Sequence, residues 1–366
     1  MSLSAIVPTL GRSPLLVPCL EALRNGDHAP DRIEILVVDQ GERPVELPAG
    51  LADRILRPGR NLGFAGGTNL GIAAASGRFV ATVNDDVLVE PGWAKILVAA
   101  LEADPRAASA QGVNLLLDQP DRADGCGIAW NRWWQAVQIG HGLPAPPVTD
   151  GVREVFGVSA TAGVFRREAL NPDSPAGPVV PHPPGPPLPS PPLPPGEGGR
   201  ASAVLLRGLG GGAPLPVEGR AMGEGSGVRP RGTPVPPFDP RLLSYYEDVE
   251  LAGRLRAAGW RALLVPAARA RHAGSATGRT MSRERWRLIY GNRWLAVASL
   301  LGRAFWPRLP WLALRDLLDL GRAVLRRDGA LAGGILAGWG RAVRHLPAWG
   351  RWSAPAVPVR TVRGFR

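Results

Sequence analysis

The sequence predicts an α/β fold, in which a mostly parallel β-sheet carries helices on both faces and further helices follow at the C-terminal end. Short, almost wholly apolar segments alternate with segments of helical spacing over the first 110 residues. Strands that are apolar along their whole length are typical of a parallel sheet buried on both sides. With 366 residues, 45% of them hydrophobic and 20% charged, the chain is long enough to bury a substantial core.

The first 110 residues show the clearest alternation of strands and helices. Residues 3–8 predict the first strand, and Ser13 followed by Pro14 predicts the N-cap and first position of the next helix. In chain order, we expect that helix over 15–24, strands over 33–39 and 54–57, a small-residue helix over 66–76, a strand over 79–83 and a helix over 93–101. Asp39 and Asp86 lie at strand C-termini, where ligands bind in such sheets.

The pattern changes in the second part of the chain. Residues 111–170 are mixed, with a strand-like segment of small residues at 155–165. About half of residues 171–237 are Pro or Gly, which predicts a disordered insertion rather than a packed core. Order resumes with a predicted helix over 246–258 and a predicted strand over 260–265.

Residues 283–366 form a basic, tryptophan-rich tail. Between 283 and 351 there are 13 Arg against four acidic residues, and seven of the twelve Trp fall between 286 and 352. Basic side chains on one helix face with Trp and Leu on another are typical of a helix that lies in a membrane interface. We expect this tail to contact an anionic membrane surface. The alternative is a set of helices packed on the rest of the protein.

The net charge of +12 has two interpretations. It indicates an anionic partner or substrate, but 42 of the 43 basic residues are Arg, which together with 47 Gly and 39 Pro also indicates a coding bias. No apolar run reaches the ~18 residues of a membrane span, and no secretory signal is expected from residues 1–13. Cys19 and Cys126, the two cysteines, exclude a disulfide scaffold and favour a reducing, cytoplasmic setting.

Two acidic pairs stand at the ends of predicted elements. Asp85 and Asp86 follow the strand over 79–83, where carboxylates suit Mg²⁺ or Mn²⁺ beside phosphate oxygens; a solvated turn is the alternative. Glu247 and Asp248 open a helix after two tyrosines, which suits a general base or simple helix capping. His272, a few residues past the strand over 260–265, is a candidate metal ligand or an ordinary structural histidine.

Taken in order, these segments resemble the inverting family 2 glycosyltransferases, and the match is closest to their rhamnosyltransferase-like and galactofuranosyltransferase-like branch. The first half carries Ile6-Val7-Pro8-Thr9, Val37-Val38-Asp39, the segment 61–69 (NLGFAGGTN) and the segment 84–87 (NDDV). The second half carries the segments 165–170 (FRREAL), 238–241 (FDPR), 246–251 (YEDVEL) and 254–256 (RLR), then Gly259-Trp260 and His272. The resemblance covers about residues 3–275, apart from the insertion.

The resemblance implies a role for each matching residue. It assigns the catalytic base to Asp248, with Glu247 as its neighbour, and a divalent cation, Mg²⁺ or Mn²⁺, to Asp86 and His272. It assigns donor binding to Pro8, Thr9, Asp39, Asn61, Gly63, Gly67, Asn69, Asn84 and Asp85. Around Gly63 and Gly67, the backbone of a helix start would approach the donor phosphates.

The same resemblance implies the fold and the reaction. We expect a GT-A-like nucleotide-diphospho-sugar transferase fold, with residues 1–110 as the nucleotide-sugar half and residues 111–282 as the acceptor and catalytic half. The expected reaction is a single displacement with inversion, from dTDP-rhamnose as the first donor candidate to a lipid-linked or polysaccharide acceptor. Such an enzyme would serve cell-wall or polysaccharide biosynthesis in the cytoplasm, peripherally on the inner face of the membrane.

Three alternatives stay open at this point. The insertion at 171–237 borders the acceptor side, so the chain is alternatively a degenerate, non-catalytic relative. A sugar-1-phosphate nucleotidyltransferase would carry Lys in the loop after the first strand, where this chain has Thr9-Leu10-Gly11-Arg12. A basic membrane- or polyanion-binding protein would explain the charge but not the placed acids, and no nucleic-acid partner is expected, because no recognised binding motif appears.

Overall fold

The structure, a computed structural model of the chain, describes residues 3–26, 33–149, 151–170, 236–274 and 282–349. The strands are β1 (Leu3–Thr9), β2 (Ile33–Asp39), β3 (Arg54–Leu56), β4 (Phe79–Val83), β5 (Val87–Val89), β6 (Ala107–Leu116), β7 (Ala123–Gly125), β8 (Ile128–Trp130), β9 (Ala136–Gln138), β10 (Arg153–Val155), β11 (Ala162–Arg166) and β12 (Arg261–His272). The α-helices are α1 (Leu16–Arg24), α2 (Gly63–Ala74), α3 (Trp93–Ala103), α5 (Glu247–Ala257), α6 (Arg283–Leu301), α7 (Leu309–Leu325) and α8 (Gly329–Trp349). Short 3₁₀ helices are η2 (Arg167–Leu170), η3 (Pro240–Leu242) and η4 (Gly302–Arg308).

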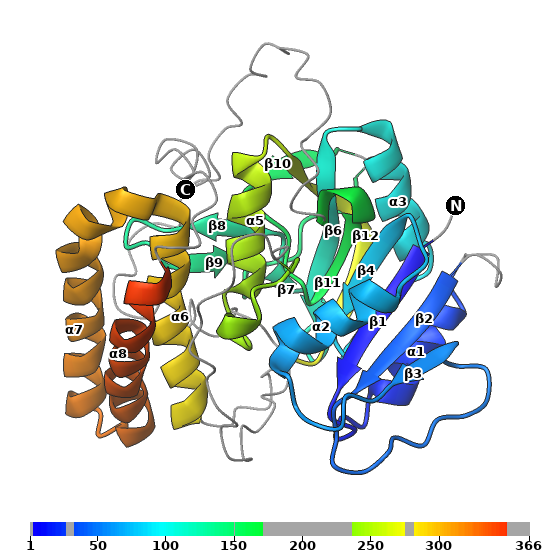
Figure 1. Cartoon of the computed structure of the whole chain (residues 1–366). Helices are drawn as coiled ribbons and strands as arrows, with labels where there is room; N and C mark the ends of the chain where they lie inside the picture. The colour runs from blue at the N-terminus through cyan, green and yellow to red at the C-terminus, as the bar shows by residue number, and fades with distance from the viewer. Residues whose placement is uncertain (1–2, 27–32, 150, 171–235, 275–281, 350–366) are drawn as a thin grey trace.

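One mixed sheet forms the centre of the molecule (Figure 1). Its strand order is β10-β12-β6-β11-β4-β1-β2-β3, with β5 paired to β12 and β7 paired to β6. Strands β4, β1, β2 and β3 are parallel, β6 and β12 form a second parallel pair, and β11 runs antiparallel between the two groups. Strands from both sides of residue 110 therefore share one sheet.

The register of the sheet gathers strand ends that the sequence singled out. Thr9 at the end of β1 pairs with Asp39 at the end of β2. His272 at the end of β12 pairs with Val87 on β5, directly after Asp86. The carboxyl ends of strands from both halves of the sheet thus lie at the same end of the molecule, where an α/β sheet binds its ligands.

Alternate residues of the parallel strands face two helical layers. Leu3, Ala5 and Val7 of β1 pack in one cluster with α1 and α3. Ile6 of β1 and Val38 of β2 pack in another cluster with α2 and α5. Figure 1 shows these helices on the two faces of the sheet. The predicted α/β class, with helices on both faces, is confirmed.

The C-terminal helices form a third layer with its own core. Helices α6, α7 and α8 pack together around aromatic residues that include Trp294 and Phe305, and this core continues into Trp130 and Tyr246. Figure 1 shows α7 at the left, away from the parallel strands. Over residues 283–349 the tail is therefore a packed helical layer, and its contact with a membrane stays a prediction. In the described part of the chain, no helix is long and apolar enough to cross a membrane.

Two local predictions in the first two parts of the chain are wrong. Helix α1 begins at Leu16 after an N-cap at Leu15, one residue later than predicted. Ser13 Oγ accepts the Leu15 amide at 3.2 Å just before the helix and donates to the Asp85 carbonyl at 3.0 Å. The segment at 155–165 is two strands, β10 and β11, with residues 156–161 between them. The Ser159 amide donates to Gln111 Oε1 at 2.6 Å, which takes this linker out of the sheet pairing.

The later elements need two further corrections. The strand predicted over 260–265 continues to residue 272, after a register shift between Leu264 and Arg269. His272 is therefore the last residue of a strand and fully buried, not a loop residue beyond it. The insertion predicted at 171–237 lies outside the described residues, apart from residues 236–237.

Candidate functional site

The ends of β1 and β4 meet through a short hydrogen bond. The buried Thr9 hydroxyl donates to Asp85 Oδ2 at 2.5 Å and accepts the Gly11 amide at 2.9 Å. Burial raises the pKa of Asp85 to about 6, and the hydrogen bond from Thr9 offsets only part of that rise. Pro8, also buried, precedes Thr9 in the sheet, opposite Val38. Two of the predicted donor residues thus form one hydrogen-bonded pair.

Asp86, His272 and Asp124 form a chain of polar contacts. His272 Nε2 lies 3.3 Å from Asp86 Oδ1, and His272 Nδ1 lies 2.8 Å from Asp124 Oδ2. Burial by itself lowers the pKa of His272, but the two carboxylates outweigh it and hold the pKa well above its usual value. Burial by itself raises the pKa of Asp124. The neighbouring His272 and His141 together outweigh burial and lower this pKa to about 2. The structure therefore brings together the two predicted metal ligands and places Asp124 at the other ring nitrogen of His272.

These side chains fit a divalent cation. Two ligands that bind one Mg²⁺ or Mn²⁺ ion at right angles, each at about 2.1 Å, lie about 3 Å apart. The 3.3 Å between Asp86 Oδ1 and His272 Nε2 matches that spacing. Asp86 Oδ1 is buried and accepts no hydrogen bond. Among the described residues, no group of three or more His, Cys, Asp or Glu is suited to a metal ion. Asp86 and His272 would therefore be a two-residue set.

Asp39 is held by the loop that follows it. Its Oδ1 accepts the Gly41 amide at 3.0 Å, its Oδ2 accepts the Val45 amide at 3.1 Å, and Arg57 Nε lies 2.9 Å from Oδ2. The neighbouring Gln40 was missed by the sequence analysis. It is buried, and its Oε1 accepts the Leu62 amide at 2.8 Å, which ties the end of β2 to the start of α2.

The start of α2 has a different role from the one expected. Its first amides already have acceptors in the chain: Asn61 Oδ1 for Gly63 at 2.8 Å, Ser244 Oγ for Phe64 at 3.3 Å and the Leu243 carbonyl for Ala65 at 2.9 Å. Because these amides are engaged, the helix start is a packing contact rather than an open phosphate site. That these residues contact the donor stays a prediction.

Two glycines of α2 are required by close approaches within the protein. Gly63 has φ +72°, and a Cβ there would lie 2.8 Å from the Leu243 carbonyl oxygen. A Cβ on Gly67 would overlap the Gln40 side-chain amide. The Asn69 carboxamide is also engaged, since it donates to the Phe238 carbonyl at 2.6 Å and accepts the Phe238 amide at 3.0 Å.

Glu247 and Asp248 lie at the start of α5. Asp248 Oδ1 accepts the Val249 amide at 2.8 Å, and Oδ2 accepts the Ala160 amide at 3.3 Å. Burial raises the pKa of Asp248 to about 6, although these backbone hydrogen bonds lower it. Glu247 is buried more deeply, and burial followed by the Asp248 charge raises its pKa well above the usual value. Asp248 is the more accessible of the two carboxyl groups.

The loop that precedes this helix is strained. Leu243, Tyr245 and Tyr246 have φ angles of +61°, +70° and +70°, in a region that residues other than glycine rarely adopt. Asn292 of α6, missed by the sequence analysis, holds this 242–246 loop: its Nδ2 lies 2.6, 2.9 and 3.0 Å from the carbonyl oxygens of residues 242, 244 and 245. Such strain persists only where surrounding contacts enforce it, and it clusters at functional sites.

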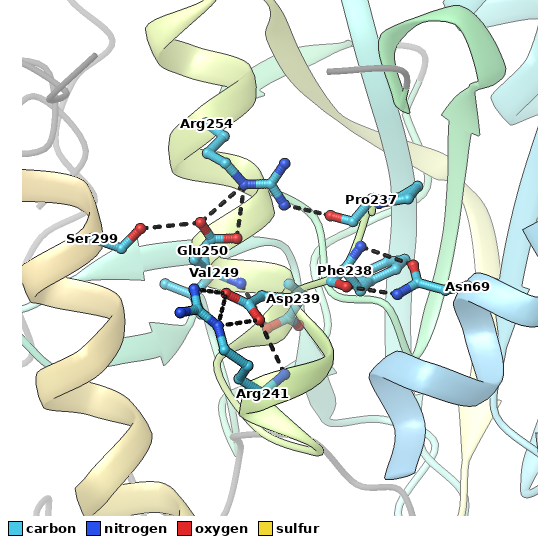
Figure 2. A network of polar contacts seen from close by, with 10 residues as sticks. Asn69, Pro237, Phe238, Asp239, Arg241, Val249, Glu250, Arg254 and Ser299 are labelled. Carbon is cyan, nitrogen blue, oxygen red and sulfur yellow. Dashed lines mark hydrogen bonds and ion pairs between the residues drawn. The ribbon is translucent and has the colours of Figure 1, made fainter. Parts of the chain in front are cut away.

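Figure 2 shows the network that fixes residues 237–254 between α2 and α6. Arg241 pairs with Asp239 at 2.6 Å, and Arg254 pairs with Glu250 at 2.8 Å. The Ser299 hydroxyl of α6 donates to Glu250 Oε1 at 3.1 Å. These charged residues of the matching motifs therefore serve to position α5 and the segment before it.

Residues 159–161 connect the two acidic pairs. The Ala160 amide donates to Asp248, and the Thr161 carbonyl accepts the Asn84 amide at 2.9 Å. Asn84 itself is buried directly before Asp85. In the sequence, the small residues of this linker predicted a strand. The linker thus connects the predicted base with Asn84, the residue that precedes Asp85 and the predicted metal ligand Asp86.

One cavity lies away from this cluster. It has a volume of about 390 Å³ and is lined by Arg78, Arg166, Arg167 and Glu168. Arg78 precedes β4 and Arg166 ends the antiparallel β11, so this cavity lies at the opposite end of β4 from Asp85. It takes no part in the site.

Comparison with protein families identifies the first part of the chain. Residues 4–119 match the family described as glycosyl transferase family 2. The resemblance to family 2 glycosyltransferases is therefore confirmed for this region, while the rhamnosyltransferase-like branch stays a prediction. The search of curated proteins returned no match.

Several solved structures are similar to this chain. GalNAc-T7, crystallised with UDP, GalNAc and Mn²⁺, is 13% identical, with a TM-score of 0.50 over 83% of this chain and 49% of its own. TarS 1–349 of S. aureus with UDP-GlcNAc is 11% identical (TM-score 0.44, covering 100% and 89%). The mannosyltransferase PcManGT of Pyrobaculum calidifontis with GDP-Man and Mn²⁺ is 15% identical (TM-score 0.43, covering 99% and 84%).

At such low identity, the likeness to GalNAc-T7 shows the fold alone, and it confirms the predicted GT-A-like fold. This chain spans about half the length of the GalNAc-T7 chain that it matches.

Proposed function

We propose that this protein is an inverting glycosyltransferase, which moves a sugar from a nucleotide-diphosphate sugar to an acceptor hydroxyl. One observation carries the proposal: the 159–161 linker contacts Asp248 through the Ala160 amide and Asn84, the residue before Asp85 and Asp86, through the Thr161 carbonyl, within a GT-A-like fold. A base on one side and an acidic, cation-binding set on the other is the arrangement that a single displacement on a sugar diphosphate needs.

Asp248 is the proposed base. A general base works best with a pKa near the operating pH, and burial raises the pKa of Asp248 to about 6. At pH 7 this carboxylate is mostly ionised and accepts the acceptor proton as the hydroxyl attacks the anomeric carbon. Burial, followed by the Asp248 charge, raises the pKa of the neighbouring Glu247 well above its usual value, which favours Asp248 as the anion of the pair.

Asp86 and His272 would hold the divalent cation, because Asp86 Oδ1 and His272 Nε2, which form an ion pair at 3.3 Å, have the spacing of neighbouring ligands. When bound, Mg²⁺ or Mn²⁺ supplies positive charge that stabilises the departing nucleoside diphosphate. Thr9 keeps Asp85 oriented beside that position through its 2.5 Å hydrogen bond. Asp124 fixes the His272 ring from its other side, as carboxylates do for many metal-bound histidines.

For the substrates, we propose dTDP-rhamnose as the first donor candidate and a lipid-linked or polysaccharide acceptor. The donor-binding set is Pro8, Thr9, Asp39, Asn61, Gly63, Gly67, Asn69, Asn84 and Asp85, in which Asn69 and the glycines act by positioning backbone. We place the enzyme in the cytoplasm, peripherally at the inner face of the membrane. Its two cysteines are buried and free, which fits a reducing compartment.

A calorimetric donor screen tests the proposal. The full chain is titrated with dTDP-, UDP- and GDP-sugars in the presence of Mn²⁺ or Mg²⁺, with and without EDTA. Binding of one donor that EDTA abolishes supports the proposal and identifies the nucleotide. If folded protein binds none of these donors, the transferase proposal fails and a non-catalytic relative is favoured.

A pair of variants tests the base. Asp248→Asn should lower transfer by about 10²- to 10⁴-fold, the usual contribution of a general base, with donor affinity nearly unchanged. Glu247→Gln is the matched comparison, because it changes the buried neighbouring carboxyl group in the same way, and it should lower transfer less than Asp248→Asn. Equal losses of donor affinity and turnover in Asp248→Asn would contradict the assignment.

A further inference from the structure

Helix α7 carries its polar side chains inward and its apolar side chains outward. Its buried residues are Leu312, Arg315, Asp316, Asp319 and Ala323. Its exposed apolar residues are Trp311 (44%), Leu314 (42%), Leu317 (53%), Leu318 (43%), Val324 (63%) and Leu325 (85%). At 3.6 residues per turn these six side chains cover an arc of about 140° on the outer side of the helix. A helix at a water-facing surface has the opposite pattern.

The buried charges fix this orientation. Asp316 accepts from Trp294 Nε1 and Trp339 Nε1, each at 2.9 Å, and pairs with Arg293 at 2.7 Å. Asp319 accepts from Tyr290 at 3.0 Å and pairs with Arg315 at 2.6 Å. Rotating α7 to bury its leucines would break the contacts of Asp316 and Asp319 with the other helices and leave Arg293 buried without its Asp316 partner, at a large cost. The Arg315–Asp319 pair lies within α7 and would turn with it. The outward apolar face is therefore a built feature of the layer.

The rim of this face is basic. Arg303 before the helix and Arg322, Arg326 and Arg327 near its end are exposed. Within residues 302–346 the acids are Asp316 and Asp319, both buried, and the half-buried Asp328. Trp306 of η4, 60% exposed, extends the apolar surface beyond the start of α7. Apolar side chains flanked by arginine and tryptophan are the composition of helices that lie in a membrane interface.

We infer that the outer face of α7 docks the protein on an anionic lipid surface, with the helix parallel to the membrane plane. The surface is defined by Trp306, Trp311, Leu314, Leu317, Leu318, Val324 and Leu325, with arginines 303, 322, 326 and 327 at its rim. The 17 residues of α7 give a contact about 25 Å long. A second copy of this chain would set the same arginine rims against each other, which disfavours a symmetric dimer.

This inference gives a physical basis for the membrane position in the proposed function, and it involves none of the catalytic residues. The test is co-sedimentation of the full chain with vesicles of phosphatidylglycerol and phosphatidylcholine, compared with phosphatidylcholine alone. The protein should bind the anionic vesicles more tightly, and the difference should shrink as salt is raised. The double variant Leu318→Asp and Leu325→Asp should weaken binding to anionic vesicles at least about 10-fold.

The matched control carries the same charge change elsewhere on the surface. Val148 and Val152 are 65% and 48% exposed, so Val148→Asp with Val152→Asp should bind vesicles as the parent does. Arg326→Gln and Arg327→Gln should each weaken binding to anionic vesicles about fivefold and leave phosphatidylcholine binding unchanged. Circular dichroism of every variant reports the fold independently of donor binding, so a failed transferase proposal does not alter this result.

Three outcomes would overturn the inference. The parent protein remains in the supernatant with anionic vesicles, or both double variants lose binding equally. Alternatively, sedimentation equilibrium shows a dimer that dissociates in the Leu318→Asp, Leu325→Asp variant, which would make a second copy the partner of this face.

Discussion

Replacing Asn292 with alanine tests how the strained 242–246 loop is held. Asn292 is fully buried on α6, and its Nδ2 reaches the carbonyl oxygens of residues 242, 244 and 245 at 2.6–3.0 Å. Its Oδ1 accepts Arg341 Nε at 3.1 Å. An amide nitrogen has two hydrogens, so it donates to two of the three carbonyls at a time. Alanine would remove this donor from the carbonyls of residues 244 and 245, while the residue 242 carbonyl still accepts the Ser244 amide at 2.7 Å.

The expected loss of stability follows from this count. Each buried polar group left unsatisfied costs about 1–3 kcal/mol, so Asn292→Ala should lower the free energy of unfolding by about 2–5 kcal/mol. Urea denaturation followed by circular dichroism measures this change. Transfer activity should fall more than donor affinity, because residues 242–246 lead directly into Asp248.

Ser299→Ala on the same helix is the matched control. The Ser299 hydroxyl makes one hydrogen bond, to Glu250, which keeps its ion pair with Arg254 when the hydroxyl is removed. We expect a loss of about 0.5–1.5 kcal/mol. If Asn292→Ala costs no more than Ser299→Ala, Asn292 does not hold the loop and the strained backbone must be enforced by other contacts.

Three further predictions follow from single features of the site. Burial raises the pKa of Asp248 to about 6, so the charged carboxylate destabilises the fold above that pH. Asp248→Asn should therefore raise the free energy of unfolding in urea at pH 7–8 and lose that gain near pH 4. A difference in unfolding free energy between variant and parent that does not change with pH would refute the raised pKa. Asp124→Asn should weaken Mn²⁺ binding in calorimetry by about 10–100-fold, with Glu90→Gln as a neutral control, since a histidine held by a carboxylate binds metal better. Gly63→Ala should lower the free energy of unfolding more than Gly59→Ala. Both glycines have φ +72°, but only at position 63 would the added Cβ contact the Leu243 carbonyl. Equal losses of stability would leave backbone strain alone as the cause.

The strands of the first half could be predicted nearly to the residue. The segments Ile33–Asp39 and Phe79–Val83 were expected with the same boundaries as β2 and β4. A parallel strand buried on both faces is apolar along its length, so its ends are visible where polar residues begin. The positions of Asp39 and Asp85 at those ends follow from the same signal.

Residues whose role depends on tertiary contacts could not be predicted in this way. Asp124 reaches His272 from 148 positions away, and Asn292 reaches the 242–246 loop from 47 to 50 positions away. Neither lies in a motif or at a predicted strand end. For Asn69 and Gly63, the sequence motif did not indicate their neighbours in the structure, Phe238 and Leu243, and their contact with the donor stays a prediction.

Helix α6 links the proposed membrane surface to the proposed base. Asn292 on one side of α6 holds the loop before Asp248, while the neighbouring Tyr290, Arg293 and Trp294 bind the two buried aspartates of α7. Since α7 is held by these side chains, its outer face and the 242–246 loop share one rigid support. Docking of that face on lipid would therefore also fix the distance of Asp248 from the membrane. A lipid-linked acceptor, whose reactive hydroxyl extends a set distance from the bilayer, is the substrate class for which such a link matters most.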